Sequence, residues 1–409
     1  MDFNDSPEEA AYRAKARAWL AANAADFVST RPGAPKENTP EFVECSRRWA
    51  ALKADAGYSC IALDKAWGGG GGDYLQHAIF ADEEAAADVR YNAVMLVAHY
   101  TALPTILAVG SEAQKEKFIR ANVRGEYIWC QLFSEPSGGS DIAAARTRAV
   151  RDGDGWRISG QKIWTSYAQF CDYGLVLVRT NPDAPKHKGL TMFIMDMHAP
   201  GVEARPIRQM TDDYEFNEVF FDNVYLPDSA RIGEVGKGWN TALVTMANER
   251  FAVGGANGPD YSAALRVARE TRGLNGPLIQ DKATRAKIAD WYIAFEGIKR
   301  TRLRAMTALS RGLAPGPENS IGKLVIASQT QDLSNGAVEL EDQFGVIDDP
   351  IRAHFTAGLQ HHLLFSPCER IAGGTDEIQR NVIAERVLGL PGDIRVDKDV
   401  AFKDLPTGR

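Results

Sequence analysis

Apolar residues recur at helical spacing in the first part of the chain, residues 1–125. Tyr12, Ala16 and Leu20 fall on one face of a predicted helix. Residues 6–9, in front of them, combine a capping serine, a proline in the first turn and a glutamate three positions after the cap. This combination is typical of a helix start, and we predict that the whole region is built of helices.

The hydrophobic pattern changes between residues 126 and 235. Val, Ile, Phe and Tyr become frequent there, and Gly, Pro and Asp interrupt the apolar runs. Five runs have the composition of strands, namely 147–150, 156–158, 173–179, 190–197 and 218–225. The first two are separated by Asp-Gly-Asp-Gly, a hairpin-turn sequence. We predict an antiparallel sheet or a small barrel.

Helical spacing returns from residue 236 onward. Two long helices are predicted, over residues 282–311 and about 318–340, with a Pro-Gly-Pro break between them. The last clear helix begins after two glycines, with Thr375 as its cap and two acids in its first turn. The pattern therefore predicts an α+β protein with three domains, at residues 1–125, 126–235 and 236–409.

Composition and charge exclude several classes of function. Of 409 residues, 44% are hydrophobic and 25% charged, and the net charge of −7 without a basic block argues against nucleic-acid binding. The sequence has no apolar run of about 18 residues that would predict a membrane span, and its acidic start does not resemble a signal peptide. The five cysteines lack a Cys-x-x-Cys pair and the seven histidines lack metal-ligand spacing. We expect reduced thiols, a cytoplasmic location and no metal site.

Residues 131–141 carry the most distinctive chemistry, with the sequence Gln-Leu-Phe-Ser-Glu-Pro-Ser-Gly-Gly-Ser-Asp. Glycine lets a backbone approach a ligand closely and adopt positive φ. The hydroxyls of Ser134 and Ser140, together with the turn amides, suit the polar edge of a flat ring, and Trp164 suits one of its faces. We interpret this combination as a flavin site, with a plain surface turn and a core tryptophan as the alternatives.

This motif resembles the first signature of the acyl-CoA dehydrogenase family. Other segments typical of that family follow in the same order: Lys-Ile-Trp-Thr-Ser at 162–166, Asn-Glu-Arg at 248–250 and Gly-Gly-Thr-Asp-Glu-Ile-Gln-Arg at 373–380. The resemblance covers roughly residues 5–390. It implies an N-terminal helical domain, a middle β-domain, a C-terminal four-helix bundle and FAD as cofactor.

The resemblance implies FAD contacts for ten residues, namely Gln131, Phe133, Ser134, Gly139, Ser140, Trp164, Ser166, Arg272, Thr375 and Glu377. Arg272 stands where the family has an arginine that reaches the phosphates of a neighbouring subunit's FAD. The phenylalanine that usually follows is absent, and a solvated arginine is the alternative. Residues 341–346 depart from the family's Gln-x-x-Gly-Gly-x-Gly segment, which leaves the adenine contacts open.

The family's reaction removes a proton from the α-carbon of an acyl-CoA thioester, for which it needs a carboxylate base. Most members have a glutamate directly before the Gly-Thr pair, where this chain has Gly373. A minority, including isovaleryl- and long-chain-type members, place it on the first long C-terminal helix before an arginine. Glu249 and Arg250 match that pattern, so Glu249 is the predicted base, and a solvated Glu–Arg pair is the alternative. Ser140, Arg250 and Gly373 are implied in substrate binding.

The implied activity is the FAD-dependent conversion of an acyl-CoA to a trans-2-enoyl-CoA, as in fatty-acid and lipid degradation. An electron-transfer flavoprotein would accept the electrons, and the assembly would be a homotetramer, a dimer of dimers. Three alternatives stay open: an oxidase or monooxygenase of the same fold, a non-catalytic subunit of a mixed tetramer, and a CoA-thioester binding module. Members with the relocated glutamate often act on branched, long or bulky acyl groups.

Overall fold

The computed structural model describes residues 5–253, 258–311, 316, 319–349, 351–353, 357–392, 394 and 397–405. The side chains of residues 249–253, 309–310 and 319 lie outside this description. The chain forms two compact units. Unit 1 comprises residues 1–209, 213–249 and 394–409, and unit 2 comprises residues 210–212 and 250–393.

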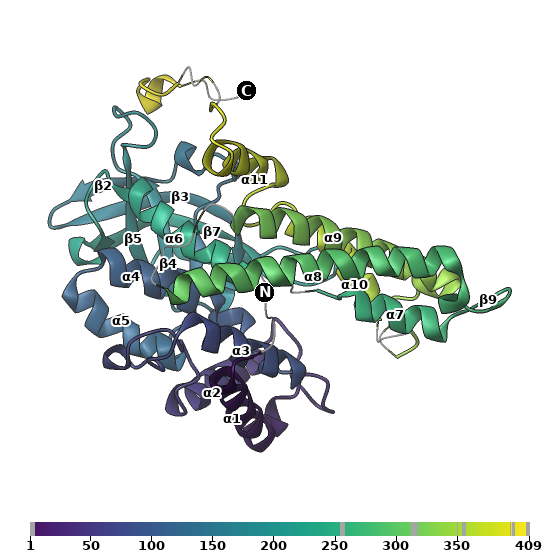
Figure 1. The fold of residues 1–409 in the computed structure, drawn as a ribbon. Coiled ribbons are helices and arrows are strands. Elements are labelled where there is room, and N and C mark those ends of the chain that lie inside the picture. The colour runs from purple at the N-terminus through teal and green to yellow at the C-terminus, as the bar shows by residue number, and fades with distance from the viewer. Residues whose placement is uncertain are drawn as a thin grey trace. The chain divides into compact units, whose positions relative to one another are not determined.

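Unit 1 begins with helices, as predicted. The α-helices are α1 (Pro7–Asn23), α2 (Pro40–Asp55), α3 (Tyr74–Ala86), α4 (Leu103–Val109) and α5 (Glu112–Arg124). The predicted capping box starts α1, because Ser6 Oγ accepts from the N–H of Glu9 at 3.2 Å and the Glu9 carboxylate accepts from the N–H of Ser6 at 2.6 Å. Helix α1 packs on α3, and α2 packs on α5. Figure 1 shows α1, α2 and α3 gathered together at the N-terminal end of the chain.

A mainly antiparallel sheet follows. Its strands are β1 (Trp129–Leu132), β2 (Arg148–Asp152), β3 (Gly155–Ser166), β4 (Tyr173–Arg179), β5 (Leu190–Asp196), β6 (Val202–Pro206), β7 (Phe216–Pro227) and β8 (Arg231–Ile232). The strand order is β6-β7-β3-β2-β4-β5-β8, and β1 pairs with β4 in parallel. The structure confirms the predicted middle sheet, although β3 is much longer than the predicted run at 156–158.

Strand β4 is buried on both faces, which explains its continuous apolar sequence. Val176 and Val178 face a core shared with the first helices, such as α2 and α3. Leu175 and Leu177 face a second core that includes residues of α4, α5 and α6 (Gly238–Val253). The alternation of a strand thus divides the apolar side chains between two cores and fixes the position of the sheet between helical layers.

Unit 2 is helical around α9. Its elements are α7 (Tyr261–Glu270), β9 (Arg272–Gly273), β10 (Gly276–Pro277), α8 (Lys282–Ser310), α9 (Asn319–Leu340), α10 (Gly358–Glu369), α11 (Asp376–Val382) and a π-helical turn at Ile383–Val387. Helices α7, α8, α10 and α11 all contact α9, and Figure 1 shows α8 and α9 side by side. The core of this unit includes Trp291, whose indole N–H donates to Asp332 at 2.7 Å. Helices α8 and α9 confirm the two predicted long helices.

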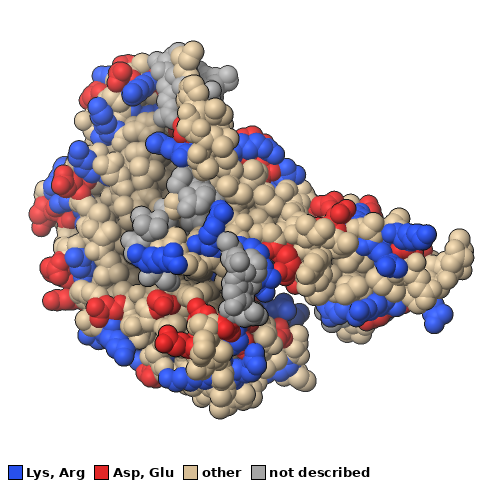
Figure 2. Space-filling model, viewed as in Figure 1, with Lys and Arg blue, Asp and Glu red and all other residues tan. Residues whose placement is uncertain are grey.

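On the face drawn in Figure 2, Lys and Arg side chains are mixed with Asp and Glu side chains, and broad areas of other residues lie between them. Among the described residues, no helix combines the length and the apolar character needed to cross a bilayer. Within the same residues, no cluster of three or more His, Cys, Asp or Glu side chains has an arrangement that would hold a metal ion.

Candidate functional site

The glycine loop, defined here as residues 133–141, leaves the sheet at the end of β1. The parallel register places Leu132 opposite Val176 in the middle of β4, so the loop begins from a fully buried part of the sheet. Phe133 is 3% exposed and packs in the same core as Trp129 and Leu175. Its side chain therefore anchors the loop, and only its backbone is available for the predicted contact with a ring.

Backbone hydrogen bonds hold the glycine loop and use several of its carbonyl groups. The carbonyl of Ser134 accepts from the N–H of Ile163 at 3.0 Å, and Glu135 and Gly138 exchange two backbone hydrogen bonds of 2.9 and 3.1 Å. Within the described part of the chain, no hydrogen bond takes up the N–H groups of Ser134, Ser137, Gly139 or Ser140. These N–H donors are therefore unused within the described residues, and the Ser134 hydroxyl in the same loop is half-buried.

A buried ion pair lies behind the loop. Lys162 Nζ lies 2.8 Å from Glu135 Oε1, and the side chains of the two residues are 0% and 5% exposed. The same ammonium donates to the carbonyl of Phe133 at 3.0 Å. Burial raises the pKa of Glu135, but the charge of Lys162 and the N–H groups of Arg146 and Thr147 outweigh burial, so that this pKa lies below its usual value. Glu135 is thus held as a carboxylate.

Trp164 is turned out to solvent by a bulge in β3. The pairing of β3 with β7 shifts register between Lys162 and Thr165, and Trp164 has a φ of +59°. Trp164 is 57% exposed, and its ring meets the edge of Phe216, at 6.1 Å between centroids and 87° between planes. A core role for this tryptophan is therefore wrong. Ser166, two residues further along β3, is half-buried.

The predicted site residues of unit 2 lie on two separate features. Arg272 is exposed on β9, in a short hairpin with β10. Thr375 caps α11 by accepting from the N–H of Ile378 at 3.3 Å, which confirms the predicted cap, and Glu377 is exposed in the first turn of this helix. Gly373 precedes the cap with a φ of +65°, a conformation that favours glycine.

The turn at Gly373 and Gly374 is held by buried side chains. Lys323 of α9, which is 2% exposed, donates to the carbonyl of Gly374 at 2.6 Å. Gln379 of α11, which is fully buried, donates to the carbonyl of Gly373 at 2.8 Å. The place where most of the family has its catalytic glutamate is thus a well-braced turn without a side chain.

The predicted base, Glu249, lies in α6, as does Arg250. Their side chains are outside the described part of the structure, so their roles stay predictions. The last side chain of α6 before them that the structure describes, Asn248, donates to the carbonyl of Val244 at 2.9 Å.

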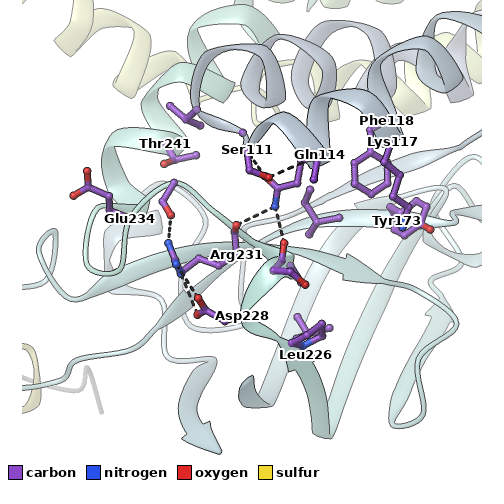
Figure 3. Close-up of a pocket in the computed structure, with 18 of the residues that line it drawn as sticks. Ser111, Gln114, Lys117, Phe118, Tyr173, Leu226, Asp228, Arg231, Glu234 and Thr241 are labelled. Carbon is purple, nitrogen blue, oxygen red and sulfur yellow. Dashed lines mark hydrogen bonds and ion pairs between the residues drawn. The ribbon is translucent and has the colours of Figure 1, made fainter. Parts of the chain in front are cut away.

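A pocket of about 1210 Å³ opens in unit 1 between α5, α6 and the segment after β7 (Figure 3). Gln114 of α5 donates to the carbonyls of Ser229 and Arg231 at 2.9 and 3.0 Å, and Arg231 pairs with Asp228 at 2.8 Å. These polar groups on the pocket wall satisfy one another. They brace α5 against the segment after β7. Much of their hydrogen-bonding capacity is used within the protein.

This pocket is separate from the glycine loop. Tyr173 and Asp196, which pair where β4 begins and β5 ends, line the pocket. The glycine loop continues β1 beyond Leu132, in the direction in which β4 runs toward Arg179. The two features therefore lie toward opposite ends of β4, and the pocket does not contain any of the predicted flavin residues.

Sequence reasoning missed the ion pair of Glu135 and Lys162. A signal was present in the strand alternation. Trp156, Ile158 and Lys162 stand at even positions of β3 and are all buried, and a lysine in an apolar register needs an acidic partner. Glu135 in the adjoining loop is that partner.

Comparisons with known proteins agree with this geometry. Profiles of the N-terminal, middle and C-terminal domains of acyl-CoA dehydrogenases match residues 6–126, 130–224 and 236–388. Acyl-CoA dehydrogenase FadE34 of Mycobacterium tuberculosis is 40% identical over 76% of this chain, but the match spans only 42% of FadE34. Acyl-CoA dehydrogenase IpdE1 of the same organism is 34% identical over 94% of this chain and 98% of its own length.

Solved structures share the fold. The structure described as the Tcur3481-Tcur3483 steroid ACAD has a TM-score of 0.82 at 23% identity and covers 96% of this chain and all of its own. The ChsE4-ChsE5 complex from Mycobacterium tuberculosis has a TM-score of 0.79 at 26% identity, with coverage of 96% and 100%. This chain belongs to the acyl-CoA dehydrogenase family, whose members are oxidoreductases that act on acyl-CoA thioesters.

Proposed function

We propose that this protein is an FAD-dependent dehydrogenase that converts an acyl-CoA thioester to a trans-2-enoyl-CoA. The observation that carries the proposal is the hydrogen bond from the N–H of Ile163 to the carbonyl of Ser134, which joins the glycine loop to the segment of the exposed Trp164. Among the described residues, the N–H groups of Ser134, Gly139 and Ser140 in this loop have no partner. The polar edge of an isoalloxazine ring is rich in acceptors, and its faces are apolar. Unused N–H donors and the Ser134 hydroxyl suit the polar edge of the ring. An exposed indole suits one of its apolar faces.

Several residues of unit 1 would hold the flavin ring: Gln131, the backbone of Phe133, Ser134, Gly139, Ser140, Trp164 and Ser166. Arg272, Thr375 and Glu377 are further proposed FAD contacts, and a guanidinium suits a diphosphate by charge and shape. Bound FAD supplies the hydride acceptor for the reaction. The acyl-CoA itself would be held in part by Ser140, Arg250 and the turn at Gly373.

Glu249 is the proposed base, whose carboxylate takes the proton from the α-carbon of the thioester. Its position next to Arg250 in α6 matches the minority pattern of the family. Gly373 supports the assignment, because the commoner position of the base holds no side chain here, in a turn braced by Lys323 and Gln379. A base in an apolar, dehydrated site has a raised pKa, which suits proton abstraction near neutral pH.

An electron-transfer flavoprotein is the proposed electron acceptor, and a cytoplasmic homotetramer is the proposed form. Exposed apolar residues of unit 2 support self-association: Leu274 is 105% exposed, Ile293 66% and Leu388 66%. Leu274 lies in the hairpin of Arg272, and Figure 1 shows β9 at a projecting tip of this unit. A projecting hairpin with an arginine suits a contact with a neighbouring subunit.

A mixed tetramer is the second candidate, because a solved structure of this fold is described as a complex of two named chains, ChsE4 and ChsE5. Size measurement of the protein expressed alone separates the two assemblies. A tetramer with FAD in every chain supports the homotetramer. FAD that is lost from the lone chain and retained on co-expression with a homologous chain supports the mixed assembly.

The function is tested by the visible spectrum of the purified protein, recorded without oxygen as acyl-CoAs are added. Because the relocated base suggests bulky substrates and one structure of this fold is described as a steroid ACAD, the panel includes straight, branched and polycyclic acyl-CoAs. We expect a yellow protein that one acyl class bleaches. A colourless protein, or one that no acyl-CoA bleaches, contradicts the proposal. Rapid reoxidation by air would instead identify an oxidase.

A further inference from the structure

We propose that Glu135 and Lys162 are positioning residues that hold the glycine loop and Trp164 in the arrangement that binds FAD. The inference rests on the proposed function. It concerns a buried ion pair that touches no exposed surface, since the two side chains are 5% and 0% exposed. Its role would be to shape the backbone that meets the ring.

The pair joins three separate segments. Lys162 on β3 donates to the carbonyl of Phe133 at the start of the glycine loop, at 3.0 Å. Glu135 accepts from the N–H of Arg146 at 2.6 Å and from the N–H of Thr147 at 2.9 Å, just before β2. Both ends of the excursion from β1 to β2 are thus fastened to one point inside the protein.

The pair also helps to separate used acceptors from unused donors in the loop. The carbonyl of Phe133 accepts from Lys162 and that of Ser134 accepts from the N–H of Ile163, so both carbonyls are used inside the protein. The N–H groups of Ser134, Gly139 and Ser140 are left for an external partner, as far as the described residues show. A ring with hydrogen-bond acceptors on its edge needs such free N–H donors in its binding site.

Trp164 depends on the same anchor. Lys162 points into the protein, and the bulge that exposes Trp164 begins directly after it, with the register regained at Thr165. Lys162 keeps the inward register of the strand, and the bulge directly after it turns Trp164 outward. Loss of the anchor would let the strand return toward regular pairing and would change the direction of the indole.

Stability alone does not explain the pair. A buried ion pair is often no more stabilising than apolar residues of the same volume, whereas loss of one partner leaves a costly lone charge. A neutral pair should therefore preserve folding and lose the fixed loop. This difference separates a positioning role from a merely structural one.

The test compares four variants by thermal unfolding of the apoprotein and by the Kd for FAD, read from flavin fluorescence. Lys162→Met and Glu135→Gln each break the pair, and the double variant replaces it with neutral groups. The control is Lys53→Met, which breaks a second buried Lys–Glu pair, where Lys53 Nζ and Glu84 Oε1 are 3.0 Å apart and both side chains are 8% exposed. That pair lies among the first helices and does not touch the glycine loop.

We expect the FAD affinity to fall by about tenfold or more in Lys162→Met, Glu135→Gln and the double variant. It should stay within about twofold of wild type in Lys53→Met, although this variant loses stability too. The double variant should regain stability over Lys162→Met without regaining FAD affinity. If Lys162→Met does not fold, the milder Glu135→Gln decides by the same criterion.

An FAD affinity within about twofold of wild type in the folded loop variants would overturn the inference while leaving the proposed function intact. A loss of FAD affinity in Lys53→Met as large as that in the loop variants would also overturn the inference. A wild-type protein that takes up no FAD would contradict the proposed function itself. In the apoprotein, hydrogen exchange at residues 133–147 gives an independent readout, and it should speed up in Lys162→Met and not in Lys53→Met.

Discussion

The N–H of Ile163 donates to the carbonyl of Ser134 at 3.0 Å. This single hydrogen bond joins two motifs that are far apart in the sequence, the glycine loop and the segment that carries Trp164. It brings the start of the glycine loop next to the backbone of the segment that carries Trp164, a residue that is 57% exposed. The flavin interpretation depends on this juxtaposition, because neither motif alone offers both a polar edge and an apolar face.

Trp164→Ala tests the role of the exposed indole. Because more than half of this residue is exposed, we expect the free energy of unfolding of the apoprotein to change by less than about 0.5 kcal/mol. Loss of a stacking partner should weaken FAD binding by about 1 kcal/mol, or about fivefold in Kd. Tyr225→Ala, at another exposed aromatic of the sheet, is the control. Equal effects of the two changes on FAD binding would refute the assignment.

Glu369 predicts a pH dependence of stability. Burial raises its pKa from 4.5 to about 7, against the opposing charge of Lys323. The folded state thus binds the proton more tightly than the unfolded state, and the resulting stabilisation, complete below about pH 4.5, is lost as the pH rises through about 7. Glu369→Gln should therefore match the wild type near pH 4.5 and exceed it by about 2 kcal/mol at pH 8.

Chemical denaturation across this pH range measures the difference. Glu270→Gln, at an exposed glutamate at the end of α7, should show no comparable trend. His362 lies 3.8 Å from Glu369, and burial lowers its pKa to about 4, so that it stays neutral over most of the range. A stability gain that is the same at both ends of the range would contradict the assigned titration.

Gly373→Ala tests the turn where most of the family has its base. The φ of +65° makes any side chain strained there, and we expect a loss of about 1 kcal/mol in the free energy of unfolding. Under the proposed function, the added methyl group should also slow the reduction of the flavin by acyl-CoA. This effect should be larger than any loss of bound FAD. Gly297→Ala is the matched control. It lies inside α8 with no described atom within 4 Å of an added Cβ, and should gain about 0.5–1 kcal/mol.

The sequence was a good guide where local chemistry decides the structure. The capping box at Ser6 and the cap at Thr375 form as predicted, because each depends on residues only three positions apart. Strand β4 matches its apolar run of 173–179, since burial on both faces leaves no polar interruption before Arg179. The domain boundaries stay predictions, because the structure divides the chain by contacts into two units.

Long-range effects escaped prediction. Strand β3 extends to Ser166 through a polar stretch and two register shifts, and its bulge hides the period on which strand prediction depends. Strand β6 is a polar edge strand that includes Glu203 and Arg205, so it gives little apolar signal. The pair of Glu135 and Lys162 is formed across 27 residues, and only the fold shows that both side chains are buried.

The most direct test of the central claim is the rate at which an acyl-CoA bleaches the flavin without oxygen, measured for the wild type and for Glu249→Gln. The account predicts a yellow wild-type protein that is bleached rapidly. It predicts a variant that keeps its FAD and is bleached about 1000-fold more slowly, because a neutral amide cannot take the α-proton. A Glu249→Gln variant that is bleached at the wild-type rate would contradict the account.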